Sequence, residues 1–336
     1  MSEAQAQPQV LKPLKTWSHL AGRRRKPSEY EIVTANLHYN NRDAQAPYEL
    51  DPDLAMNKWY KNNTFGSALQ HSDWNAFRDP EEVVYRSYNM MQDGQENYVF
   101  GLFDQFNTRE HDTSMTPCWA DTLARLYTPA RYLFHTLQMA SAYVGQVAPA
   151  STITNCHYFQ MADSFRWLSH TAYRTKELSL SFTDKGFGTG ERHYWETDTA
   201  WQGFRELMEK VLVTWDWAEG FFALSLIAKP AIDEAVLRKL GESARHNGDM
   251  LLGLVNDAQL MDAARHRRWA TALVKMALEK TGNKEVLQGW MAKWEPLADK
   301  AIDAYCAALV DVPGAAAQAK QATRDFRQGL GLGLGL

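Results

Sequence analysis

The sequence predicts an all-α protein, a bundle of long helices preceded by an extended N-terminal arm. From about residue 80 onward, apolar residues recur at spacings of three, four and seven, which places them on one face of an α-helix. No alternating apolar and polar run bounded by turn signals, as a strand would show, competes with these stripes. The chain has 336 residues, of which 45% are apolar, enough for one large helical domain or for two domains.

Residues 1–79 are predicted to form a long extended arm. Six prolines interrupt the first 80 residues, and no helical period is sustained there. The arm is nevertheless rich in aromatic residues, which disordered segments normally lack. We therefore expect it to lie on its own core or on a partner, with Trp17, Tyr30 and Trp59 as candidate interface anchors.

The helical body is expected over residues 80–310. Asp79 can cap the first helix and Pro80 can occupy its first turn, ahead of a stripe that runs from Val84 to Phe106. Further stripes cover residues 133–144, 165–172, 212–226, 251–258 and 286–297. Breaks between helices are expected at Pro117, Pro149, residues 184–191, Pro230, residues 246–249 and residues 281–284. Residues 311–336, which end in GLGLGL, show no packing pattern and are expected to be a flexible tail.

Charge and hydropathy exclude several classes of function. The 36 Lys and Arg residues nearly balance 40 Asp and Glu residues, so no strong attraction to nucleic acid or to an anionic membrane is expected. The polar N-terminus lacks the apolar core of a signal peptide, and no run of 18 apolar residues occurs. We therefore expect a cytoplasmic protein that binds neither nucleic acid nor membrane.

The common catalytic motifs are missing from the sequence. The string GFGTG is neither a dinucleotide fingerprint nor a phosphate loop, and no Gly-x-Ser-x-Gly elbow occurs. The three cysteines lie far apart and form no Cys-x-x-Cys pair, so neither a disulfide framework nor a structural zinc site is expected. The remaining candidates for functional residues are histidines on apolar helix faces.

Two histidines stand where a di-iron bundle would place ligands. Such a bundle takes one Glu from each of two helices and a Glu-x-x-His pair from each of the other two, because the i, i+3 spacing points both ligands inward. Here His170 is preceded three residues earlier by Trp167, and His266 by Ala263. Taken singly, each histidine is better explained as a hydrogen-bonded core residue than as a metal ligand.

Several long strings resemble the β subunit of bacterial multicomponent aromatic monooxygenases of the toluene and o-xylene type, related to the β subunits of phenol hydroxylase and soluble methane monooxygenase. The strings are KTWSHLAGRRRKPSEYEIV, YNMMQDGQENYVFGLFDQF, YTPARYLFHTLQMASAYV, APASTITN, HTAYRTKELS and WEPLADKAIDAYC. The resemblance extends from about Lys12 to Leu309. It implies a ferritin-like fold, of the ribonucleotide reductase type, related to that of the catalytic α subunit.

The resemblance also implies a division of labour among subunits. In the family, β is a non-catalytic structural subunit that assembles with α and a small γ subunit into a dimer of αβγ protomers. The di-iron centre, and with it the chemistry of O2 and the aromatic substrate, belongs to α. Electrons pass from NADH through a reductase with FAD and an iron-sulfur cluster to a Rieske ferredoxin, and an effector protein acts on the complex. No cofactor or metal is expected in this chain.

Laying the α-type ligand pattern on the sequence yields a vestigial site. The two Glu-x-x-His pairs fall on Trp167 with His170 and on Ala263 with His266, and the two lone Glu positions fall near Leu137 and Glu219. At most one of four carboxylates is kept. One Glu and two neutral imidazoles cannot balance two buried ferrous ions.

Three hypotheses remain from the sequence. The first is a non-catalytic subunit of an aromatic monooxygenase, the second a self-sufficient metalloenzyme with an unorthodox site, and the third a helical interaction or regulatory protein outside the oxygenases. Iron content separates the second from the others, and co-purification with a di-iron subunit separates the first from the third. The aromatic substrate and the ring position attacked do not follow from this chain.

Overall fold

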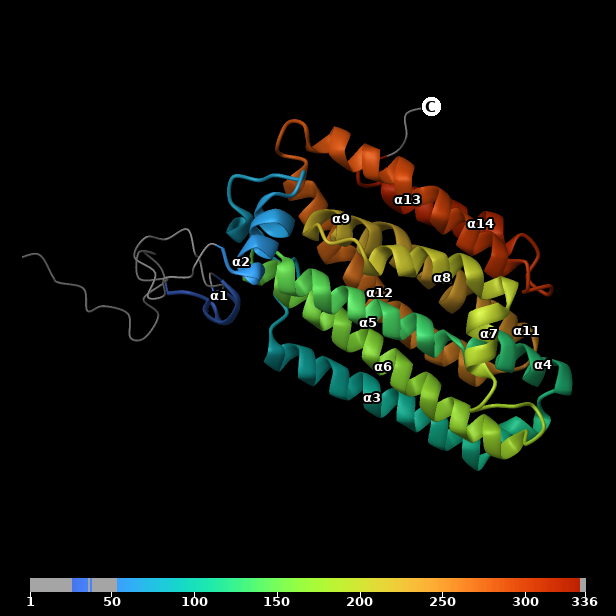
Figure 1. The fold of residues 1–336 in the computed structure, drawn as a ribbon. Helices are drawn as coiled ribbons and strands as arrows, with labels where there is room; N and C mark the ends of the chain where they lie inside the picture. Colours follow the sequence, from blue (N-terminus) through green and yellow to red (C-terminus); the bar gives the residue numbers. More distant parts are fainter. Residues whose placement is uncertain (1–25, 36, 38–52, 333–336) are drawn as a thin grey trace, which may run out of the picture.

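The computed structural model describes residues 26–35, 37 and 53–332, and this part of the chain contains helices and no strand (Figure 1). The α-helices are α1 (Glu29–Thr34), α2 (Ala55–Tyr60), α3 (Tyr85–Thr108), α4 (Pro117–Thr122), α5 (Ala130–Val147), α6 (Ser151–Ser181), α7 (Glu191–Thr197), α8 (Thr199–Leu212), α9 (Trp217–Phe221), α10 (Lys229–Ile232), α11 (Leu240–His246), α12 (Met250–Ala277), α13 (Asn283–Cys306) and α14 (Ala315–Gln328). None of these helices is long and apolar enough to cross a membrane.

Shorter segments complete the described part. Four are π-helical turns: η2 (Lys61–Phe65), η5 (Leu123–Tyr127), η6 (Phe222–Ala228) and η7 (Asp233–Lys239). Two are 3-10 turns: η3 (Trp74–Ala76) and η4 (His111–Ser114). The all-α prediction is confirmed.

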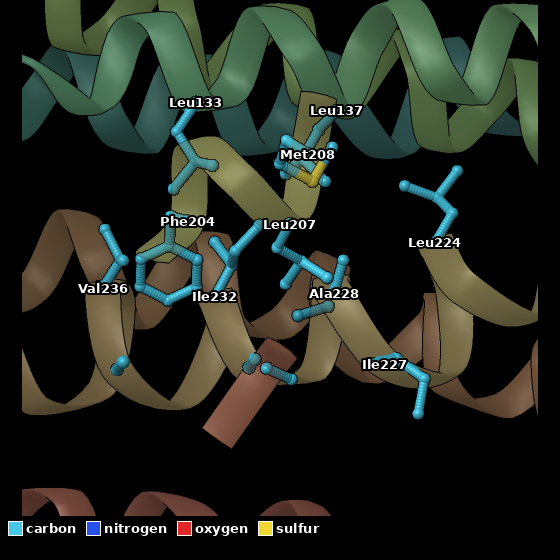
Figure 2. Packing of buried hydrophobic residues seen from close by; sticks show 14 of the residues in the cluster. Leu133, Leu137, Phe204, Leu207, Met208, Leu224, Ile227, Ala228, Ile232 and Val236 are labelled. Atoms are coloured by element: carbon cyan, nitrogen blue, oxygen red, sulfur yellow. The ribbon is translucent and has the colours of Figure 1, made fainter. Parts of the chain in front are cut away.

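The core surrounds one continuous helical segment, residues 217–246, which we call the central helix and which comprises α9, η6, α10, η7 and α11. Nearly every residue from 220 to 237 is buried, as expected for a helix that is apolar on all sides. Side chains of α5 and α8 meet this helix in one apolar layer, seen with Leu137, Met208 and Ala228 (Figure 2).

The sequence analysis expected a break between helices at Pro230, but the structure shows none there. The helix continues through it as α10, with π-helical turns on both sides. Proline lacks a backbone N–H, and the wider i→i+5 turns redistribute the hydrogen bonds around the position where that donor is missing. The segment therefore stays helical and buried.

The helix boundaries differ from the sequence prediction in two places. The first long helix begins at Tyr85, because Asp79 accepts hydrogen bonds from the backbone of Glu81 and Val83 and so closes a turn before the helix. The stripe predicted over residues 212–226 is interrupted, because α8 ends at Leu212 and Asp216 caps a new helix.

The tail expected over residues 311–336 is corrected in its described part. Helix α14 covers Ala315–Gln328 and buries Ala319 and Thr323 against the body. Arg327 forms an ion pair with Glu295 of α13 at 2.6 Å. Small alanines give this helix an apolar face that lacks the large side chains of the other stripes, so its packing face was not recognised.

The described part of the N-terminal arm lies on the body of the same chain. Ser28 and Glu31 form a capping box that starts α1, and Tyr30 is buried with its hydroxyl accepting from the Asp79 backbone N–H at 3.0 Å. This placement corrects the choice of Tyr30 as an interface anchor. Trp59 is half-buried, and its indole donates to the Tyr143 hydroxyl at 3.1 Å. Trp17 lies outside the described residues.

Candidate functional site

The positions expected to carry carboxylates lie in the apolar interior of the bundle. Leu137 of α5, Trp167 of α6 and Ala263 of α12 are all buried. Phe134, one turn before Leu137, meets the Trp167 ring edge-on with centroids 5.7 Å apart. The Trp167 indole also lies 6.1 Å from the His266 ring. An indole and apolar groups thus occupy the place where ligand oxygens would be needed.

A buried lysine that the sequence analysis missed lies beside Trp167. The Lys229 ammonium, on α10, is 4.3 Å from the centroid of the Trp167 ring and 2.6 Å from Asp233 Oδ1. Burial lowers the pKa of Lys229, and the Asp233 carboxylate opposes that shift. The ammonium is therefore held by a carboxylate on one side and by the face of an indole on the other.

Glu219 lies elsewhere, which corrects its assignment as the fourth ligand position. Its Oε1 accepts from the Lys293 ammonium at 2.6 Å and from the Trp294 indole at 2.9 Å, both on α13. Lys229, ten residues further along the central helix, is the residue that meets Trp167. A lysine inside the apolar run FFALSLIAKPAI was the signal in the sequence that could have indicated this.

The two histidines are buried, and each bonds a carboxylate on a different helix. His170 Nε2 lies 3.0 Å from Glu96 Oε1 of α3. His266 Nε2 lies 2.8 Å from Asp163 Oδ2 of α6. Burial, aided by Lys229 and Arg265, holds the pKa of His266 well below its ordinary value, so the ring is neutral and its Nε2–H donates to Asp163.

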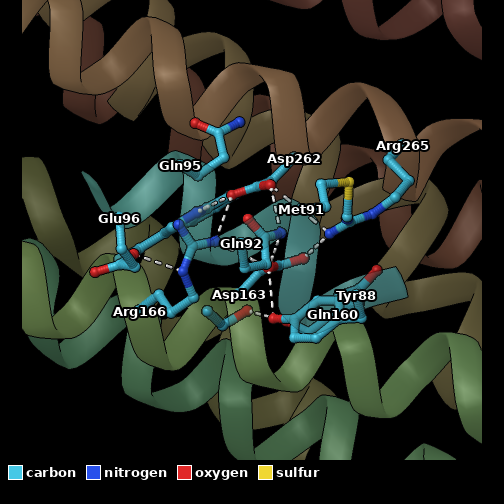
Figure 3. A network of polar contacts seen from close by, with 12 residues as sticks. Tyr88, Met91, Gln92, Gln95, Glu96, Gln160, Asp163, Arg166, Asp262 and Arg265 are labelled. Carbon is cyan, nitrogen blue, oxygen red and sulfur yellow. Dashed lines mark hydrogen bonds and ion pairs between the residues drawn. The ribbon is translucent and has the colours of Figure 1, made fainter. Parts of the chain in front are cut away.

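Asp163 is the hub of a charge network between α3, α6 and α12 (Figure 3). Its fully buried carboxylate accepts from the Tyr88 hydroxyl and from Gln92 Nε2, each at 2.8 Å, in addition to His266. It also forms ion pairs with Arg166 and Arg265. Burial raises the pKa of Asp163, and the Arg265 guanidinium is the main opposing influence.

Asp262 extends the charge network to the centre of the bundle. It accepts from the Trp167 indole at 3.1 Å, from Gln92 at 3.0 Å and from Arg166 at 3.2 Å. Arg166 continues to Glu96 at 2.7 Å. Three carboxylates, those of Asp163, Asp262 and Glu96, therefore share two guanidinium groups and several neutral donors. Across the described residues, no three His, Cys, Asp or Glu side chains are grouped so that they could hold a metal ion.

The fold and the sequence can now be compared with known proteins. Residues 53–281 match the family described as Methane/Phenol/Alkene Hydroxylase. The chain belongs to this hydroxylase family. It is 56% identical over 298 residues to the β subunit of the hydroxylase component of the toluene-4-monooxygenase system of Ectopseudomonas mendocina, which covers 89% of this chain and 91% of that relative.

A further relative and two solved structures are also similar to this chain. The oxygenase component of phenol 2-monooxygenase from Pseudomonas sp. strain CF600 is 25% identical over 70% of this chain and 71% of its own length. A solved toluene 4-monooxygenase, with toluene bound in its resting active site, superposes with a TM-score of 0.85 at 56% identity, over 89% of this chain and 98% of that chain. The structure of phenol hydroxylase from Pseudomonas sp. OX1 superposes with a TM-score of 0.80 at 20% identity, over 97% of this chain and 98% of that chain. At this identity the likeness supports the fold alone.

The charge network leads to a prediction for Asp163. In the Asp163→Asn variant, Arg265 and Arg166 would lose a buried counter-charge, so we expect the free energy of unfolding to fall by about 3–5 kcal/mol. The control is Glu81→Gln, which breaks the exposed ion pair with Arg268 and is expected to cost less than about 1 kcal/mol. Urea denaturation of the full-length chain measures both. Equal losses in the two variants would contradict the role of Asp163.

His157 is a third buried histidine in the interior of the bundle. It is fully buried on α6, and its ring meets the Phe221 and Trp269 rings edge-on, at centroid distances of 5.9 and 4.8 Å. Neither ring nitrogen has a hydrogen-bond partner among the described protein atoms. Burial lowers the pKa of His157 to about 3. The native state therefore holds this ring neutral.

This pKa predicts a loss of stability in acid. Because the folded-state pKa of His157 lies below its ordinary unfolded value of about 6.5, its contribution to stability is complete above pH 6.5 and is lost as the pH falls towards 3. In His157→Phe, we expect the slope of unfolding free energy against pH to decrease by up to about 1.4 kcal/mol per pH unit in that window. His135→Gln, at an exposed position, should leave the slope unchanged; equal slopes in all three proteins would refute the assignment.

Proposed function

We propose that this chain is the non-catalytic β-type subunit of a multicomponent aromatic-hydrocarbon monooxygenase, in which it supports a separate catalytic α subunit. The observation that carries the proposal is the Lys229 ammonium over the Trp167 ring, at the centre of the bundle where ligand carboxylates would have to converge. Family membership and the 56% identical hydroxylase β subunit support the same role.

We interpret Leu137, Trp167, His170, Ala263 and His266 as vestigial ligand positions, with Lys229 in place of Glu219 as the fourth-helix residue. These residues do not fit a di-iron centre. Three of them offer no ligand atom, and the two histidines already bond Asp163 and Glu96. A buried ammonium would also repel two dications brought into the same low-dielectric space. The self-sufficient metalloenzyme is therefore the weaker hypothesis.

The physical task of the chain is support. A catalytic subunit must keep a cavity for dioxygen and an aromatic ring open against the close packing of a protein interior. A neighbour whose own helices are fixed in register can hold the outer faces of the helices that carry the ligands. The charge network fixes α3, α6 and α12 in this way, since each of its members bonds across a helix boundary.

Family membership supports the rest of the proposed assembly. We place the di-iron centre in α, and NADH, FAD and iron-sulfur clusters in the reductase and the Rieske ferredoxin, with an effector protein acting on an (αβγ)2 hydroxylase in the cytoplasm. Its substrates would be toluene, benzene or xylene-type rings, hydroxylated with O2 during aromatic-hydrocarbon catabolism. The alternative, a helical interaction protein outside the oxygenases, is disfavoured by family membership.

The support role predicts which property the vestigial histidines affect. His170→Ala and His266→Ala remove buried hydrogen bonds and should cost about 1–3 kcal/mol of stability. Turnover per correctly assembled hydroxylase should stay nearly unchanged, because neither ring meets substrate or iron. The measurement is aromatic hydroxylation by complexes whose stoichiometry has been verified by native mass spectrometry, with complex lacking this chain as the control. A hundredfold loss of turnover with assembly intact would contradict the proposal.

A further inference from the structure

Helix α14 is held against α13 by matching stripes of opposite charge. Acidic residues recur every four positions on α13 and basic residues every three or four on α14, so each set lies on one face of its helix. Three ion pairs join the stripes: Lys320 with Asp303 at 2.7 Å, Arg324 with Asp299 at 2.5 Å and Arg327 with Glu295 at 2.6 Å. We call these three pairs the ionic clasp. Helix α14 lies along α13 (Figure 1).

The apolar contact of α14 with the body is small for a helix of its length. Its buried residues recur at every fourth position and are Ala315, Ala319, Thr323 and Arg327. An alanine side chain removes much less apolar surface from water than a leucine side chain does. The large apolar groups nearby are Phe326, which is half-buried, and Leu330 and Leu332 beyond the end of the helix. The docking of α14 therefore depends more on ion pairs than that of the helices with large apolar stripes.

Water and salt reach most of the ionic clasp. The side chains of Arg324 and Asp303 are 44% and 52% exposed, so two of the three pairs lie at the surface. Attraction between exposed charges is screened beyond about 3 Å at 1 M salt, against about 30 Å at 0.01 M. The side chain of Arg327 is 3% exposed, and only Glu295 offsets the loss of its hydration. The attraction that holds α14 should therefore weaken as ionic strength rises.

Helix α14 covers an ammonium and a thiol of the body. It packs on α10, η7 and α13. Gln318 accepts from the Lys239 ammonium at 2.6 Å. Cys306 follows Asp303 by three residues, so it lies on the face of α13 that meets α14, and it is 5% exposed. Burial raises the pKa of the Cys306 thiol to about 12, which keeps it unreactive while α14 is docked.

We propose that α14 is a strap released by ionic strength. It opens as a unit when the ionic clasp is screened, while the rest of the bundle stays folded. Segments held by few apolar contacts open with free energies well below that of global unfolding. Opening uncovers Lys239 and Cys306, so the docked strap protects this side of α13 and of the central helix from solvent. The inference uses contacts within this chain alone and goes beyond the proposed function.

The competing account makes α14 a fixed part of the body, anchored by Leu330 and Leu332. In that case the release of α14 requires global unfolding, and screening of the ionic clasp leaves it docked. The two accounts differ in how the opening of α14 responds to salt.

Thiol labelling of the full-length chain with N-ethylmaleimide measures the opening, because this reagent is uncharged and its own reactivity does not follow the ionic strength of the solution. Cys306 is the reporter, buried Cys156 on α6 reports global unfolding, and exposed Cys118 reports the activity of the reagent. Peptide mass spectrometry separates the three rates. When reclosing is fast, the rate at Cys306 follows the population of the open strap.

We expect labelling of Cys306 to rise about fivefold between about 0.01 and 1 M NaCl, with Cys156 and Cys118 unchanged. Deuterium uptake over residues 315–328 should rise with the same salt dependence. Labelling of Cys306 that ignores salt, or that rises only together with Cys156, would overturn the strap. Faster labelling of Cys306 without faster uptake over residues 315–328 would place the opening elsewhere in the chain and would overturn it as well.

Charge reversal tests the ionic clasp itself. Arg324→Glu places like charges at Asp299 and Glu295, and we expect labelling of Cys306 at low salt to rise about five- to tenfold. Asp299→Arg should act in the same direction, and the two changes combined form a reversed pair that returns the rate to within about threefold of the native one. The matched control is Arg192→Glu, which alters an exposed ion pair with Glu196 on α7 and should leave the rate unchanged. A double variant that labels as fast as the single ones would contradict the ionic clasp.

Discussion

The carboxylate of Asp163 is buried in the middle of the bundle, and the surrounding helices must supply enough donors to hold it there. An isolated carboxylate in a protein interior is far less stable than in water, so its compensation has to be nearly complete. Tyr88, His266 and Arg265 provide most of it from two other helices. Because these donors reach Asp163 only in one register, the network fixes how α3 and α12 lie against α6.

A second buried charge imposes the same requirement on the central helix. Lys229 is compensated by Asp233 one turn away and by the face of Trp167. Asp233 in turn faces Arg267 of α12 at 3.4 Å. The interior thus contains single positive charges, each matched by carboxylates of the same chain. A pair of dications would need several additional anionic ligands at the positions that Leu137, Trp167 and Ala263 now fill.

The all-α fold could be predicted from the sequence because its long helices carry large apolar residues at helical spacing, as between Leu133 and Val144. Local signals misled where tertiary packing decided the outcome. Pro230 reads as a break but sits within a buried helix, and α14 packs through alanines that no apolar stripe indicates. His170 and His266 were identified from spacing alone. Asp163 was missed because its partners lie on other helices and are brought together only in space. Lys229 was missed although the apolar run around it carried a signal.

The most direct measurement is the iron content of the full-length chain after separation from its partners and anaerobic incubation with ferrous ion. If buried lysine and arginine side chains already balance the carboxylates of the core, the chain should retain no stoichiometric iron, while the separated catalytic subunit should retain two ions. Two irons bound per chain, and lost on substitution of His170 and His266, would contradict the account.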